Sequence, residues 1–196
     1  MQRTQHNRDF YDRPTLLVAR QLLGKRLVRL DGNQRTAGVI TEVEAYRGEE
    51  DLACHARAGL TPRTSVMYGS AGYAYVYFTY GMHWLFNCVA ERAGYPAAVL
   101  VRSILPTENL NVIAERRAGR PQSEWTNGPA KLCQALNIDG DLNGIDLCDP
   151  ASELFIEAGE PVPDSSVTRT PRMGLNTVPE PWKSIPWRFY YTADVD

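Results

Sequence analysis

Three apolar segments that alternate with a period of two and follow one another closely constrain the fold more than any other feature of this chain. They occupy residues 73–80, 84–90 and 97–103, and only short turns separate them. Connections this short join antiparallel neighbours, because a parallel pair needs a crossover of a dozen or more residues. The segments therefore predict an antiparallel meander and not a series of βαβ units.

A further strand is predicted for residues 38–46, whose side chains alternate between two faces. Two carboxylates and a tyrosine share one face near its end, and an acidic loop then leads to His55. Such a face can hold a base-like acid beside a stacking ring, or it can be a solvated sheet face, on which alternating glutamates are ordinary. The pattern places Val39, Thr41, Val43 and Ala45 on one face, and Ile40, Glu42, Glu44 and Tyr46 on the other.

Helices are predicted around this sheet from apolar stripes and from residues that start or stop helices. Residues 15–23 form one helix, which ends at Gly24. Thr107 is predicted to cap a second helix whose Leu110, Ile113 and Ala114 face inward. A third helix begins at Pro129, since proline suits a first turn, and its start is either a phosphate site or an ordinary cap.

The other segments complete an α+β prediction. Residues 25–30, 154–157 and 188–191 are expected strands, and residues 48–70 form a long binding loop in which Glu49, Glu50 and Asp51 are solvated. We predict a single compact domain over residues 1–196, built on a curved, mainly antiparallel β-sheet with peripheral helices. Residues 1–10 are expected to be a flexible tail.

Polar residues interrupt the apolar faces of the meander. Asn87 and Arg102 are costly to bury without partners, so each needs either a hydrogen-bonded core role or a ligand. Tyr80 belongs to the opposite face or points out from the turn before Gly81. The shared faces are Tyr73, Tyr75, Tyr77 and Thr79 on the first segment, His83, Leu85, Asn87 and Val89 on the second, and Ala98, Leu100 and Arg102 on the third.

Composition narrows the function classes. The net charge of −2 gives no global attraction to nucleic acid, so any phosphate binding must be local. The four cysteines lack zinc-like spacing, and we expect them to be free thiols, with Cys54 a buried thiol and not a nucleophile. No segment approaches the apolar run of about 20 residues that spans a bilayer, and the start is polar, which predicts a cytoplasmic protein with no membrane partner.

Seven motifs together resemble the alkyladenine (methylpurine) DNA glycosylase family, that is, 3-methyladenine DNA glycosylases. They occur in the family's order and extend from about residue 12 to residue 191, so the resemblance covers nearly the whole chain. The motifs are EVEAYRGEEDLACH, TPRTSVMYG, AYVYFTYGMHWLFN, VLVRSILP, NGPAKLCQAL, PRMGL and PWRFYY.

The resemblance implies a base-excision repair enzyme that turns damaged purines out of double-stranded DNA and hydrolyses the N-glycosidic bond. Glu44 would activate the water, with Arg102 supporting it, and Glu42 would be dispensable for chemistry. Tyr46, His55 and Tyr77 would enclose the extruded base, Asn87 would face guanine's amino group, and Tyr80 would be the wedge in the duplex. The candidates for DNA-backbone contacts are Arg63, Met82, His83, where the family often has tyrosine, and Lys131.

We expect a monomer, as the default for an enzyme that scans DNA, and chemistry based on one carboxylate that needs neither metal nor organic cofactor. No lysine nucleophile falls within the pocket motifs, so no strand cutting is expected. The proposed chemistry requires the ionised Glu44 side chain to face a water molecule and the sugar of the extruded nucleotide. Two other readings remain open: a damage-binding or RNA-binding module without cleavage, and a small-molecule enzyme with a carboxylate base, which would leave the Tyr80 tip unused.

Overall fold

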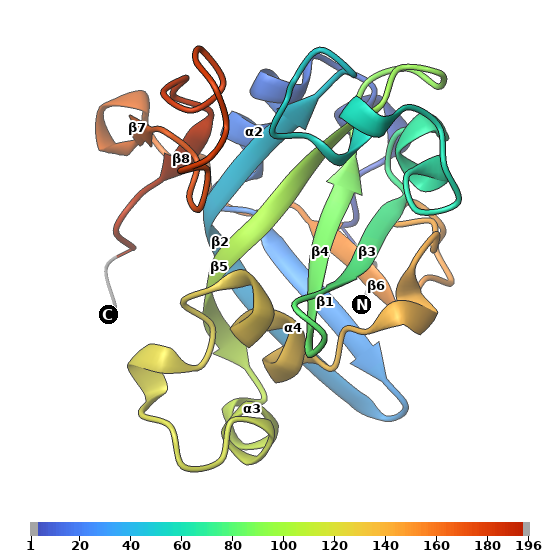
Figure 1. The fold of residues 1–196 in the computed structure, drawn as a ribbon. Helices are drawn as coiled ribbons and strands as arrows, with labels where there is room; N and C mark the ends of the chain where they lie inside the picture. Colours follow the sequence, from blue (N-terminus) through green and yellow to red (C-terminus); the bar gives the residue numbers. More distant parts are fainter. Residues whose placement is uncertain (1–3, 194–196) are drawn as a thin grey trace.

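The computed structural model describes residues 4–193, and within that range the strands form one eight-stranded sheet. The main path runs β3-β4-β5-β2-β1-β6, and every pairing in it is antiparallel. The predicted α+β fold, a single compact domain on a mainly antiparallel sheet, is confirmed (Figure 1). The strands are β1 (Arg26–Asp31), β2 (Gln34–Arg47), β3 (Ala74–Thr79), β4 (His83–Val89), β5 (Ala97–Glu108), β6 (Leu154–Glu157), β7 (Thr168–Thr170) and β8 (Arg188–Tyr190).

Four α-helices lie around the sheet in the described part of the chain. They are α1 (Arg8–Tyr11), α2 (Thr15–Leu22), α3 (Leu110–Arg116) and α4 (Pro129–Leu136). Proline opens α4 as expected, and α2 ends just before Gly24. None of the helices within residues 4–193 has the length and apolar character needed to cross a membrane.

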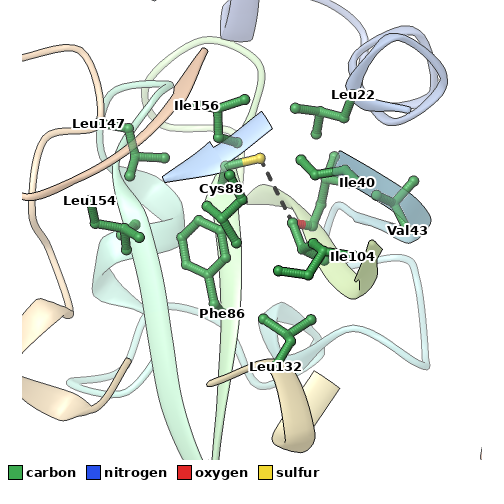
Figure 2. Packing of buried hydrophobic residues seen from close by; sticks show 14 of the residues in the cluster. Leu22, Ile40, Val43, Phe86, Cys88, Ile104, Leu132, Leu147, Leu154 and Ile156 are labelled. Carbon is green, nitrogen blue, oxygen red and sulfur yellow. Dashed lines mark hydrogen bonds between the residues drawn. The ribbon is translucent and has the colours of Figure 1, made fainter. Parts of the chain in front are cut away.

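The main core fills the space between the sheet and α2 and α4 (Figure 2). Phe86 and Cys88 of β4 stand at its centre with no exposed surface, and Cys88 Sγ lies 3.8 Å from the carbonyl oxygen of Val99. All four cysteines are free thiols, as predicted. Burial raises the pKa of the Cys54 thiol to about 12, so it stays protonated and is a poor nucleophile.

A bulge in β2 corrects the predicted face of Ile40. The register shifts between Ile40 and Glu42, which places Ile40 in the core with Val43 and Ala45. An inserted residue exchanges the two faces of a strand, because side chains alternate with a period of two. The residues before the bulge pair with β1, and those after it pair with β8.

Three further predictions are wrong. Thr107 does not cap α3: it lies in β5, and its hydroxyl contacts the carbonyl oxygen of Ala37 at 3.4 Å, while Asn109 precedes the helix. Leu110, the first residue of α3, is 37% exposed and does not face inward, whereas Ile113 is buried. Asp51 is fully buried and not solvated, because Arg172 pairs with it.

Residues 4–10 belong to the segment expected to be a tail, and several of them contact the rest of the chain. Gln5 forms an isolated bridge with Glu157, and the backbone N–H of His6 donates to Ile156 at 3.0 Å. The His6 ring stacks on Phe10 at 3.9 Å. These contacts attach residues 4–10 to β6, and residues 1–3 lie outside the described part of the chain.

Candidate active site

Residues of β2, β3, β4 and β5 surround a cavity of about 380 Å³, which we call the first cavity. The rest of its wall comes from residues 53–55, Met67, Pro129 and residues 173–175. Seven of the eleven residues predicted from sequence line it: Glu44, Tyr46, His55, Tyr77, Tyr80, Asn87 and Arg102. Residues that are far apart in the chain therefore meet at one concave site, which is the usual form of a small-ligand pocket.

Glu44 lies in this wall with no exposed surface. Its environment is polar and not hydrophobic. Oε2 accepts a 2.7 Å hydrogen bond from the Tyr46 hydroxyl, and Oε1 accepts one of 2.7 Å from the backbone N–H of Met173. Arg102 stands 3.3 Å from Oε1. These donors replace water around the buried carboxylate, which a hydrophobic site could not do.

A bulge in β5 places the Arg102 side chain between the carboxylates of Glu42 and Glu44. Glu42 of β2 pairs with Ser103 of β5, and the next residue, Val43, pairs with Val101. The register therefore skips Arg102, which forms a bulge in β5. Its Nε donates to Glu42 at 2.7 Å, and Arg188 of β8 donates to the same oxygen at 2.6 Å. Burial disfavours the Arg102 cation, but Glu44 and Glu42 outweigh burial and raise its pKa.

Aromatic rings form one side of the cavity. The rings of His55 and Tyr77 meet nearly edge to face with centroids 4.5 Å apart, and Tyr75 lies 5.3 Å from Tyr77. His55 Nδ1 is 2.9 Å from the Tyr75 hydroxyl. Burial, with the nearby charges of Arg63 and Arg57, lowers the pKa of His55 to about 4. His55 is therefore neutral at pH 7.

Tyr46 connects this aromatic wall to Glu44. Its ring packs against the Arg172 guanidinium, 4.6 Å from the ring centre. Burial and the Glu44 carboxylate raise the pKa of Tyr46 well above its usual value. The hydroxyl therefore keeps its proton and acts as a donor to Glu44.

Asn87 is 4% exposed on the cavity wall. Its Nδ2 donates to the carbonyl oxygen of Tyr75 at 3.0 Å. This bond fixes the amide in one orientation. Its role against guanine stays a prediction.

Tyr80 stands on the turn between β3 and β4 and is 87% exposed. Both Tyr80 (φ 52°) and Gly81 (φ 68°) have positive φ, and the N–H of Met82 closes the turn on Thr79 at 3.2 Å. Successive positive φ angles characterise the tight turns of hairpins and are strained for tyrosine. The turn thus presents a large ring to solvent at the rim of the cavity, with Met82 69% exposed beside it.

The four predicted backbone-contact residues lie outside the first cavity. Arg63 is exposed, with its guanidinium 5.3 Å from the Tyr77 ring centre. Met82 is on the Tyr80 turn. His83 and Lys131 line a neighbouring cavity of about 700 Å³, which we call the second cavity. Their contacts with DNA stay predictions.

Sequence reasoning missed the group that holds Glu44 and Tyr46 in place. Arg172 makes two hydrogen bonds to Asp51, of 2.6 and 2.9 Å, and one of 3.0 Å to the carbonyl oxygen of Ala45. The next residue, Met173, supplies the N–H that binds Glu44. The motif PRMGL contained both residues, but no local pattern assigns an arginine in a loop to a buried carboxylate.

The first cavity thus combines a buried carboxylate, a neutral histidine and aromatic walls, with an exposed tyrosine at its rim. The profile of the family described as methylpurine-DNA glycosylase (MPG) matches residues 9–195. The chain belongs to the methylpurine-DNA glycosylase family.

Curated relatives share this sequence over nearly their whole length. One from Myxococcus xanthus is 49% identical over 92% of this chain and 87% of its own length. One from Methanocella arvoryzae is 48% identical over 93% and 90%, and one from Desulfitobacterium hafniense is 44% identical over 93% and 93%. Each of the three carries the provisional name of a 3-methyladenine DNA glycosylase.

Proposed function

We propose that this protein is a 3-methyladenine DNA glycosylase of base-excision repair, which extrudes a damaged purine from duplex DNA and hydrolyses its N-glycosidic bond with a water activated by Glu44. One observation carries the proposal. Glu44 lies in the first cavity beside Tyr46, with the His55 and Tyr77 rings on the wall and Tyr80 at the rim. A base-flipping enzyme needs an acid or base, an aromatic slot and a plug for the gap in the duplex.

The aromatic wall suits an electron-poor purine. Alkylation at a ring nitrogen leaves 3-methyladenine with a positive charge while it is bound to the sugar. Tyrosine faces attract such a ring by about 0.5–2 kcal/mol through their quadrupoles. Because the lowered pKa of His55 keeps it neutral at pH 7, it adds a ring surface without a repelling charge.

Bond cleavage follows the course of other glycoside hydrolyses. As the C1′–N bond breaks, its electron pair passes to the purine, which leaves as a neutral base, and positive charge develops on the sugar. The Glu44 carboxylate stabilises that charge and takes a proton from water, whose oxygen forms the new bond to C1′. Each Glu44 oxygen has two lone pairs, so the bond from Tyr46 to Oε2 leaves that oxygen a further lone pair for the water.

The first cavity also supports a monofunctional reaction. No lysine is among the described residues that line it, so an imine between a lysine and the sugar has no nucleophile there. We therefore propose hydrolysis without cutting of the strand. Borohydride added during turnover should trap no covalent protein–DNA adduct. We further propose that the protein acts as a monomer, in the cytoplasm where DNA lies.

The decisive experiment is release of free bases from methylated duplex DNA, resolved by chromatography. Glu44→Gln should lower the single-turnover rate at saturating protein by about 100-fold or more, because an amide cannot take the proton. Glu42→Gln is the matched control: Glu42 lies two residues away and contacts Arg102 and Arg188. It should stay within about threefold of wild type. Near-normal release by Glu44→Gln would disprove the catalytic assignment.

A further inference from the structure

An arginine stands next to each of two tyrosines in the wall of the first cavity. The Arg172 guanidinium lies 4.6 Å from the ring centre of Tyr46, and the Arg63 guanidinium lies 5.3 Å from the ring centre of Tyr77. Both tyrosines line the cavity, and neither arginine does. Each arginine therefore lies outside the wall, where its charge can act on a bound base only from a distance.

The two cations differ in whether a carboxylate neutralises them. Arg172 makes hydrogen bonds of 2.6 and 2.9 Å to Asp51, so that pair has little net charge. No carboxylate lies within 4.0 Å of Arg63 in the part of the chain that the structure describes. Arg63 contacts the carbonyl oxygen of Phe78 at 3.3 Å and the Tyr75 hydroxyl, and both partners are neutral. Arg63 therefore brings a net positive charge to the aromatic wall.

That charge reaches the groups inside the first cavity. Burial lowers the pKa of His55 to about 4, and the Arg63 charge adds to this effect. Burial raises the pKa of Tyr75 and of Tyr77, and the Arg63 charge opposes both rises. All three rings line the cavity. A positive potential there stabilises negative charge and disfavours positive charge, although water weakens it because Arg63 is exposed.

Two classes of damaged purine differ in the charge that they carry while the glycosidic bond breaks. A purine alkylated at a ring nitrogen is a cation on the sugar, and the electron pair of the broken bond makes it a neutral base. A deaminated purine is neutral on the sugar, so the same electron pair makes it an anion, which then takes a proton from solvent. In both reactions water gives its hydroxyl to C1′ and its proton to Glu44. A nearby cation therefore disfavours the first class and stabilises the leaving group of the second.

The titratable residues described in the wall of the first cavity offer no ready proton for that anion. Glu44 has to be ionised to accept the proton of the water. The pKa of His55 is about 4 and that of the Cys54 thiol is about 12, both far from pH 7. Arg102, a cation in the wall, is shared by the carboxylates of Glu42 and Glu44. The positive charge of Arg63 is therefore the remaining source of help for a neutral base.

We propose that Arg63 determines which class of damaged purine the first cavity processes, because its charge, acting past the Tyr77 ring, favours neutral bases over cationic ones. The inference rests on the proposed function, since it presumes excision of a purine. Tyrosine faces still attract a cationic ring, and Arg63 reduces that advantage. Arg63 does not touch the base, so it is a specificity-determining residue and not a catalytic one. A contact with the DNA backbone would instead change both classes alike.

The test is a competition between two substrates in one reaction. A methylated duplex that releases 3-methyladenine supplies the cationic purine, and a duplex that contains hypoxanthine supplies the neutral one. The ratio of released bases gives the ratio of the two kcat/KM values, which does not depend on how much of a variant is folded. A base stacked on Tyr77 would lie about 9 Å from the Arg63 guanidinium, where solvent screens part of the interaction. In Arg63→Gln the ratio of 3-methyladenine to hypoxanthine should rise about three- to tenfold.

A series of charges at the same position separates the charge from the shape of the side chain. Arg63→Lys keeps the charge and should stay within about twofold of wild type, whereas Arg63→Glu reverses it and should raise the ratio further than Arg63→Gln. Arg57→Gln is the matched control, because Arg57 is also exposed on this loop and donates to the carbonyl oxygen of Leu52 at 3.0 Å. Its effect should be smaller than that of Arg63→Gln. An unchanged ratio in Arg63→Gln, equal changes in Arg63→Lys and Arg63→Gln, or an equal effect of Arg57→Gln would overturn the proposal.

A second measurement needs neither DNA nor catalysis. The chain has three histidines, so the His55 ring can be followed by NMR during a pH titration of the free protein. Arg63→Gln should raise the pKa of His55 from about 4 toward its usual value, and Arg63→Lys should restore the low value. The same His55 pKa in wild type and Arg63→Gln would mean that the charge does not reach the cavity, and the proposal would be wrong. Normal base release by Glu44→Gln would disprove the catalytic proposal but would leave the titration and the ratio unaffected.

Discussion

Asp51 and Arg172 form a doubly hydrogen-bonded ion pair with no exposed surface on either side chain, 121 residues apart in the chain. The pair joins the loop after β2 to the segment before β8. Arg172 also contacts the Tyr46 ring and the carbonyl oxygen of Ala45, and its neighbour Met173 binds Glu44. One buried arginine thus holds the two residues on which the proposed chemistry depends.

Asp51→Asn should destabilise the fold by about 3–5 kcal/mol, because it leaves the Arg172 cation buried without its partner. Urea unfolding measures the change. Residual folded protein should also release bases more slowly, since the Met173 donor is no longer held against Glu44.

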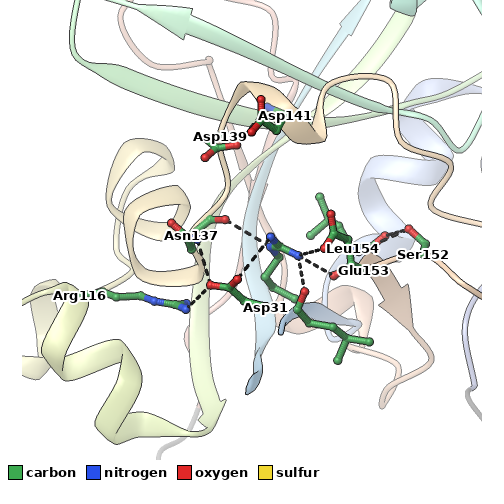
Figure 3. A network of polar contacts seen from close by, with 10 residues as sticks. Asp31, Arg116, Asn137, Asp139, Asp141, Ser152, Glu153 and Leu154 are labelled. Carbon is green, nitrogen blue, oxygen red and sulfur yellow. Dashed lines mark hydrogen bonds and ion pairs between the residues drawn. The ribbon is translucent and has the colours of Figure 1, made fainter. Parts of the chain in front are cut away.

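A second buried arginine provides the matched control. Arg29 is 7% exposed and pairs with Glu153 at 2.9 Å, in the network where Asp31 also meets Arg116 and Asn137 (Figure 3). Glu153 is 51% exposed, so Glu153→Gln should cost less than about 1 kcal/mol and leave base release unchanged. If both variants lost the same free energy of unfolding and the same rate of base release, the Asp51–Arg172 pair would contribute no more than the Arg29–Glu153 pair.

Tyr46→Phe removes one donor from Glu44 and keeps the ring. A hydrogen bond to a charged group contributes about 1.5–3 kcal/mol, so the single-turnover rate should fall about 10- to 100-fold while DNA affinity is retained. Tyr95→Phe is the control, because its hydroxyl bonds to Glu50 at 2.8 Å on the surface. A normal rate for Tyr46→Phe would mean that the hydroxyl does not support Glu44.

Strands with regular alternation could be predicted from sequence. The meander of β3, β4 and β5 appears where it was predicted, apart from the extension of β5 to Glu108, because a period of two is visible in these segments. Ile40 was assigned to the wrong face, because a single inserted residue in β2 exchanges the faces and leaves no local sign. The predicted helix start at Thr107 is wrong for a different reason. Pairing with β2 extends β5 through Pro106, so contacts with a distant strand outweigh the preference of threonine for a helix cap.

The site was predictable where residues share a strand face, and not where partners are distant. Glu44 and Tyr46 are two positions apart on one strand, so their meeting followed from alternation. Asp51 looked solvated because it stands in an acidic loop, and nothing near it in sequence indicates Arg172. Met173 contributes a backbone N–H, a group that every non-proline residue carries, so residue identity cannot reveal it.

Tyr80→Ala should separate flipping from chemistry. Tyr80 is 87% exposed, so its loss should change stability by less than about 0.5 kcal/mol. Extrusion from a duplex costs a few kcal/mol, which a wedge offsets, so base release from duplex DNA should fall about 10- to 100-fold. Release from single strands should fall less than about threefold. Met82→Ala, on the same turn, is the control and should have a smaller effect; equal losses on duplex and single strands for Tyr80→Ala would exclude a wedge.

His55 should make the folded state sensitive to acid. Its pKa is lowered to about 4 in the folded protein by burial and by Arg63 and Arg57, whereas an unfolded histidine titrates near about 6.5. Between these values the unfolded chain binds more protons, so stability should fall as the pH drops from about 6.5 to about 4. His6, also lowered to about 4 by burial and by Lys25 and Arg13, adds to the same fall.

His55→Gln removes one titrating group, so its free energy of unfolding should depend less steeply on pH in this window. Urea unfolding at several pH values between 7 and 4 measures the slope for wild type and variant. His6→Gln should also make the slope less steep, because burial, Lys25 and Arg13 lower the pKa of His6 to about 4. Parallel curves for wild type and His55→Gln would mean that His55 titrates alike in both states, and the neutral ring assigned to the base pocket would then lose its support.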